Sequence, residues 1–120
     1  MKPEITQAMQ KWFFRSKVYA NALHIDKSVD DQQQIHSLGL WLDEASDEFE
    51  KALSFLTVEQ RKRFNFLGLK FVQAQSWYIG DIRLNTKYRS SRTKERLAQS
   101  TLNYENTKFN VEAFLMTVAQ

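Results

Sequence analysis

Six cations fall within fourteen residues, from Arg83 to Arg96, with Glu95 as the one acid among them. Lysine and arginine bind phosphate backbones because neutralising the phosphates releases condensed counterions, and a nearby aromatic ring can stack on an unpaired base. The sequence therefore predicts a surface that binds nucleic acid or another anion. It would consist of Arg83, Lys87, Tyr88, Arg89, Arg92, Lys94 and Arg96. The competing interpretation is a solvated loop that only keeps the protein soluble.

Carboxylates are concentrated in a different segment, residues 26–59, which holds nine acids against two bases. Asp43 with Asp47, and Glu44 with Glu48, are each four residues apart and would lie one helical turn apart. Such spacing is typical of a solvated acidic face and is also compatible with docking a basic partner or a second copy of the chain. The alternative interaction surface comprises these four acids and the aromatic residues Trp12, Phe13 and Phe14.

Other chemistry finds little support in the residue types. The two histidines, His24 and His36, are not preceded by the glutamate that a Glu-x-x-His metal motif requires. The chain has no cysteine, which excludes disulfides, thiolate zinc sites and cysteine nucleophiles. Its three glycines cannot form a phosphate-binding loop. We therefore expect no catalytic site, no metal, no cofactor and no small-molecule substrate.

Three glycines and one proline in 120 residues leave little means of making tight turns, which favours long helices. A first helix is predicted from Pro3 to about Ile25, with proline at the helix start. A second, which Ser28 could cap, follows with apolar residues alternately three and four apart. This seam consists of Ile35, Leu38, Leu42, Ala45, Phe49, Ala52 and Leu56. Gly39 lies beside the seam and would allow another helix to approach closely.

Two more helices are predicted in the second half of the chain. Thr57 followed three residues later by Gln60 forms a capping box, so a third helix should begin at Val58 and run to about Leu84. The polar, basic residues 85–93 resemble a connection. A fourth helix should begin near Thr93, and its three asparagines allow a break near residues 106–107.

Size and composition complete the prediction of the fold. A chain of 120 residues with 42% apolar content is typical of one globular domain, so we expect an all-α, single-domain antiparallel bundle of about four helices over residues 1–120. No segment is apolar enough to span a membrane, and residues 1–14 do not resemble a secretory signal. A cytoplasmic location is expected.

Two functional hypotheses follow from the charged surfaces. The first is a non-catalytic helical accessory protein that contacts an anionic partner, above all a nucleic-acid backbone, through residues 83–96. An acidic protein surface would be the other anionic partner. The alternative is a regulator or inhibitor that binds another protein, or a second copy of itself, through the acidic face and exposed aromatic residues.

Overall fold

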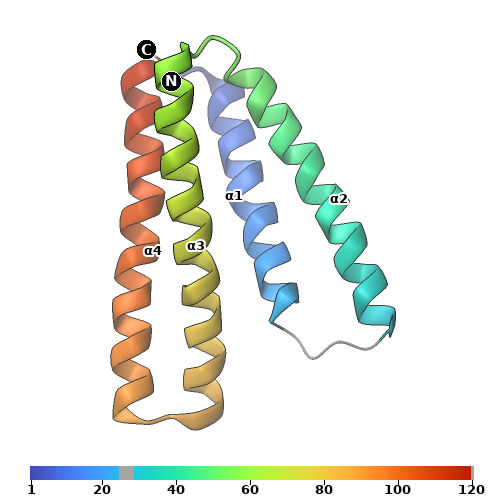
Figure 1. Ribbon diagram of the computed structural model, residues 1–120, viewed down its shortest axis with the longest axis vertical. Helices are drawn as coiled ribbons and strands as arrows, with labels where there is room; N and C mark the ends of the chain where they lie inside the picture. The colour runs from blue at the N-terminus through green and yellow to red at the C-terminus, as the bar shows by residue number, and fades with distance from the viewer. Residues whose placement is uncertain (25–28, 120) are drawn as a thin grey trace. The chain divides into compact units, whose positions relative to one another are not determined.

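The computed structural model describes residues 1–24 and 29–119, and within these ranges every regular element is a helix. The helices are α1 (Pro3–Leu23), α2 (Val29–Ala52), α3 (Val58–Tyr88) and α4 (Ser91–Val118) (Figure 1). The predicted all-α fold with four helices is confirmed. Ser28, the predicted cap of the second helix, lies outside the described residues. No helix in the described ranges combines the length and apolar character needed to cross a bilayer.

The chain divides into two compact units, one holding α1 and α2 and the other holding α3 and α4. Each unit is a hairpin of two antiparallel helices that pack against each other (Figure 1). The prediction of a single domain over residues 1–120 stays a prediction. The two hairpins carry the two charged segments separately, because the acids of residues 26–59 fall mainly on α2 and the bases of 83–96 on α3 and α4.

The α1–α2 hairpin is held together by an apolar stripe on each helix, and the stripe on α2 is the predicted seam. Ile5 and Met9 are buried on α1, and Ala45 and Phe49 are buried on α2. The Trp12 ring bridges the two helices, with its centroid 5.6 Å from that of Phe49. The stripes weaken toward the α1–α2 connection, where Leu23 is exposed and Ile35, Leu38 and Leu42 are only half-buried.

Gly39 lies against α1, as the sequence suggested, but the space around it does not require glycine. A Cβ built at Gly39 would lie 3.6 Å from Cε2 of Tyr19, an ordinary van der Waals distance. Alanine favours a helix interior over glycine by about 1 kcal/mol. We therefore expect Gly39→Ala to raise the free energy of unfolding by about that amount, measured by denaturant unfolding followed by circular dichroism. A loss of stability would show that the two helices pack closer at this point than described.

The α3–α4 hairpin has an aromatic centre. The rings of Tyr78 and Tyr104 are stacked, with centroids 4.6 Å apart and planes 9° from parallel. Phe71, seven residues before Tyr78 on α3, lies 5.8 Å from Tyr104 between centroids. Burial raises the pKa of Tyr104, and a hydrogen bond with Gln75 opposes that rise. Val111 and Leu115 of α4 are completely buried and extend the core along the helix.

Two sequence-based predictions are wrong in this hairpin. The predicted connection of residues 85–93 is helical except for Arg89 and Ser90, because α3 continues to Tyr88 and α4 already begins at Ser91. The predicted break near residues 106–107 is absent from α4, which is continuous. Low asparagine propensity costs each position well under 1 kcal/mol, and buried residues on both sides of the predicted break hold the helix together.

Candidate functional site

The two-residue turn between α3 and α4 is closed by a reciprocal pair of hydrogen bonds. Ser90 N–H donates to Oγ1 of Thr93 (2.9 Å), and Thr93 N–H donates to Oγ of Ser90 (3.1 Å). This is the geometry of a capping box, with threonine in the place usually taken by glutamate or glutamine. The Thr93 hydroxyl also lies 3.0 Å from Oδ1 of Asn85, so it ties the start of α4 to the last turn of α3.

Arg89, the residue after the last residue of α3, has an unusual backbone conformation. Its N–H donates to the carbonyl of Asn85 (3.0 Å), and its φ is +25°, the one positive φ at a non-glycine residue among those described. Helices commonly end with a left-handed residue after the last turn, and glycine usually occupies it because a Cβ is strained there. An exposed arginine therefore stands where glycine would be easier to accommodate.

The strain at Arg89 can be tested by substitution. We expect Arg89→Gly to raise the free energy of unfolding by about 1 kcal/mol, because the left-handed conformation costs a residue with a Cβ about that much. Arg89→Ala removes the same charge but keeps the Cβ, so it should bring no such gain. Thermal and denaturant unfolding of the two variants compare them directly. Equal stability of both variants would show that the backbone at this position is not strained.

The short turn gathers the predicted cations at one end of the hairpin. Five of the six are exposed, and we call the four of them nearest the turn the basic tip: Lys87, Arg89, Arg92 and Lys94. Tyr88 is exposed beside them, with the Lys87 ammonium 5.5 Å from the centroid of its ring. Lys87 also lies in the last turn of α3, where a positive charge complements the helix dipole. Arg92 and Lys94 lie in the first turn of α4.

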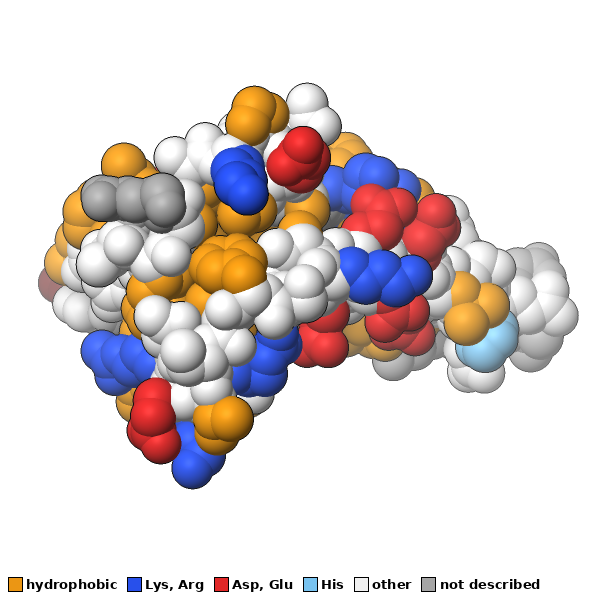
Figure 2. Space-filling view, turned by 90° about the horizontal axis from the view of Figure 1, so that it is seen from above, with side chains coloured by type: hydrophobic (Ala, Val, Ile, Leu, Met, Phe, Trp, Pro, Cys, Tyr) orange, Lys and Arg blue, Asp and Glu red, His pale blue; other side chains and the backbone are white. Residues whose placement is uncertain are grey.

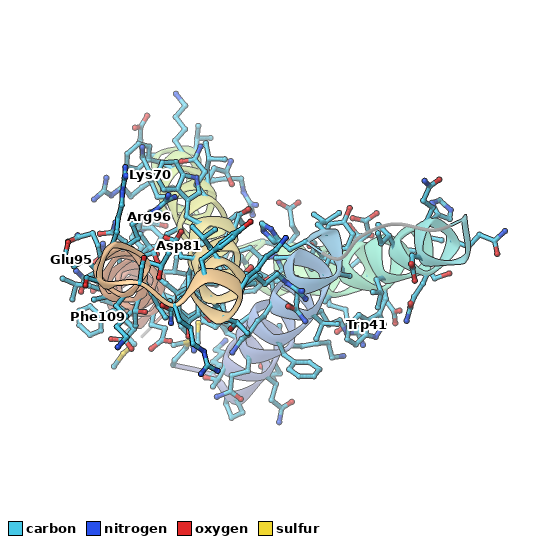
Figure 3. The ribbon with its side chains drawn as sticks, turned by 90° about the horizontal axis from the view of Figure 1, so that it is seen from below. Trp41, Lys70, Asp81, Glu95, Arg96 and Phe109 are labelled. Atoms are coloured by element: carbon cyan, nitrogen blue, oxygen red, sulfur yellow. The ribbon has the colours of Figure 1, made fainter. Side chains whose placement is uncertain are left out.

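The other two predicted cations are placed differently. Arg96 lies one turn further along α4, and its Nη2 is 3.4 Å from Oδ1 of Asp81, a carboxylate whose side chain is only 11% exposed (Figure 3). Arg96 thus has a structural role that the sequence did not suggest. Arg83 is partly buried on α3 and makes contacts within the protein. Arg92 and Arg96 are four residues apart on α4 and share a helical face. Arg89 is not on that face, because it lies outside both helices.

The residues of the alternative interaction surface lie on the α1–α2 hairpin, where two of the four acids are paired. Lys11 Nζ is 2.8 Å from Oε2 of Glu48, and Arg15 Nη1 is 3.6 Å from Oε2 of Glu44. Figure 2 shows acidic and basic side chains next to one another on this hairpin. The hydrogen bond from Lys11 lowers the pKa of Glu48, so this pair persists at neutral pH and is lost as the pH falls through that lowered pKa. Asp43 and Asp47 are exposed.

The three aromatic residues predicted with those acids are not equally accessible. Phe13 is buried, and Trp12 is half-buried against Phe13 and Phe49. Phe14 is exposed and meets the ring of Trp41 edge-on, at 6.1 Å between centroids. The alternative hypothesis therefore stays a prediction that depends on Asp43, Asp47 and Phe14. Sequence reasoning did not predict the pairing of Lys11 and Arg15 with these acids. The two bases are four residues apart and share a helical face.

Across residues 1–24 and 29–119, no three acidic or histidine side chains come together in a way that could hold a metal ion. The fold and the site thus define an all-α protein built of helical hairpins, with a cationic turn. Comparisons with protein-family models, with curated proteins and with solved structures found no match to this chain.

Proposed function

We propose that the protein is a non-catalytic binding protein whose basic tip contacts a nucleic-acid backbone with little dependence on sequence. The observation that carries the proposal is Arg89. A cationic side chain occupies a backbone position that favours glycine, and it stands between further exposed cations on α3 and α4. Residues held in unfavourable backbone conformations are often associated with function. No ion pair within the described residues uses Arg89, Arg92 or Lys94, whereas Arg96 has Asp81.

The chemistry of the tip supports phosphate binding more than sequence readout. Arginine presents a planar fork of donors that matches phosphate oxygens, and lysine contributes a point charge. Each phosphate that a cation neutralises releases counterions, so the binding affinity falls as the salt concentration rises. For each contact, the logarithm of the binding constant falls by about 0.9 per log unit of salt. Contacts of this kind fix position on the backbone but read no base.

The test compares three full-length proteins in fluorescence anisotropy or gel-shift titrations at about 50 and 200 mM salt, a range over which phosphate contacts weaken strongly. The wild-type chain should bind single- or double-stranded oligonucleotides in a salt-sensitive manner. The variant Arg89→Gln/Arg92→Gln/Lys94→Gln should bind at least about tenfold more weakly, with a salt slope flatter by about 2 to 3. Arg96 stays unchanged in this variant because its loss would leave the buried Asp81 carboxylate unpaired.

A matched control separates the tip from overall charge. The variant Lys2→Gln/Lys17→Gln/Lys62→Gln removes the same number of charges from exposed positions elsewhere. It should retain most of the wild-type affinity and salt slope. The proposal is wrong if wild-type protein shows no salt-sensitive binding, or if the control variant loses as much affinity as the tip variant.

A further inference from the structure

A groove of about 440 Å³ runs between α3 and α4, away from the turn itself. The α3 wall consists of Lys70, Gln73, Ala74 and Trp77, which share one helical face at spacings of three and four residues. The α4 wall includes Ser100 and Asn103. The groove therefore lies wholly within one hairpin, and its volume is in the range of small-molecule sites.

Trp77 gives this groove a large accessible aromatic surface. The residue is 72% exposed although it belongs to the groove wall. Ala74, one turn before it on the same face, has a side chain too small to cover the indole. A flat ring next to open space is a stacking platform, and a stacked base contributes about 1 to 3 kcal/mol of binding free energy, whichever base it is.

The polar residues of the groove match the edges of a nucleobase. The amide groups of Gln73, Asn103 and Asn106 each offer both donors and an acceptor, as base edges do. Lys70 supplies a cation at the end of the groove farther from the turn, and no carboxylate belongs to the lining. A second groove on the same hairpin also contains a lysine and an asparagine, but it includes the carboxylate of Glu105 and has no aromatic ring.

The groove lies on the same hairpin as the basic tip. Asp81 is one turn beyond Trp77 on α3, and Arg96 is one turn before Ser100 on α4, so their ion pair lies between the groove and the turn. Figure 3 shows Lys70, Asp81 and Arg96 on one side of the hairpin and Phe109 on the other. Ten residues of helix, about 15 Å, separate Trp77 from Lys87, a span that a few nucleotides can bridge.

We infer that the groove binds an unstacked base of a single-stranded nucleic acid whose phosphates lie on the basic tip. The inference rests on the proposed function and adds the kind of strand that is bound. A paired base cannot leave its stack without a cost of a few kcal/mol, so a single strand is the natural ligand. Stacking on Trp77 supplies affinity for any base, and Lys70 holds a phosphate beyond it.

The experiment measures binding of two labelled probes of equal length, about twelve nucleotides, which is within common site sizes for single-strand binders. One is oligothymidylate and the other is the same phosphodiester chain without bases. Wild-type protein should prefer the probe with bases. Trp77→Ala should weaken oligothymidylate binding by about fivefold to 150-fold and leave the abasic probe unaffected. Trp77→Phe should retain the preference, because phenylalanine also stacks.

A control in the second groove, Leu102→Ala, should change neither affinity, since Leu102 is exposed on α4 and lies outside the proposed base site. A parallel series with oligouridylate distinguishes RNA from DNA as the source of the base. Equal wild-type affinity for the probes with and without bases overturns the groove assignment alone. Oligothymidylate binding that survives neutralisation of the tip, while still requiring Trp77, overturns the tip assignment alone. Absence of binding to either probe overturns both.

Discussion

Phe71→Ala should destabilise the protein by about 3 to 5 kcal/mol, the usual cost of removing a fully buried phenylalanine. Phe71 is completely buried on α3, and its ring packs on Tyr104, which in turn stacks on Tyr78. Removing the ring loses its transfer free energy and leaves a cavity beside aromatic groups that are too rigid to fill it. Typical domains are stable by about 5 to 15 kcal/mol, so the variant is expected to lose a large share of its stability.

Denaturant unfolding of the full chain measures this effect as a shift of the midpoint at unchanged slope. Phe109→Ala is the matched control, because Phe109 lies on the other helix of the same hairpin and is 65% exposed (Figure 3). It should change stability by less than about 0.5 kcal/mol, as surface substitutions usually do. Similar losses in the two variants would mean that the aromatic centre does not hold the hairpin together.

The fold class was predictable because it depends on features that local sequence records. Scarce glycine and proline predicted long helices, and the capping box at Thr57 predicted the start of α3 at Val58, as the structure has it. The prediction that α4 begins near Thr93 was wrong for a definable reason. Residues 85–93 are polar because their side chains lie at the end of a hairpin, and polarity alone resembles a loop. The cap of Ser90 and Thr93 was the available signal, but its third-position threonine departs from the common pattern.

Ion pairs between residues far apart in the chain could not be predicted from the sequence. The bases of residues 83–96 were found from composition, yet nothing in the spacing of Arg96 and Asp81, fifteen residues apart, indicated an ion pair. Lys11 and Arg15 likewise neutralise acids more than twenty-five residues away on α2. The groove at Trp77 was also missed, because its walls come from two helices and the register between them is set by packing rather than by local pattern.

The turn that positions the basic tip should depend on a single hydroxyl group. Thr93 is buried, accepts a hydrogen bond from Ser90 N–H, and lies within hydrogen-bond distance of Asn85 Oδ1. Thr93→Val keeps the shape of the side chain but leaves these polar groups without a partner. Loss of a helix cap or of a buried hydrogen-bond partner costs about 1 to 3 kcal/mol, so we expect a destabilisation of about 2 kcal/mol.

Thr86→Val provides the comparison for this last variant, because the Thr86 hydroxyl is exposed and bonds only to the Ile82 carbonyl within its own helix. It should alter the free energy of unfolding by less than about 0.5 kcal/mol. Neither variant changes the charge of the protein. Binding assays at a temperature where both are folded therefore report how the position of the basic tip affects binding, at constant charge. Thr93→Val should weaken oligonucleotide binding, since Arg89 and Arg92 flank the loosened turn, whereas Thr86→Val should not. If Thr93→Val is as stable as the wild type, the cap does not hold the turn, and the tip must be positioned by the packing of α3 on α4 alone.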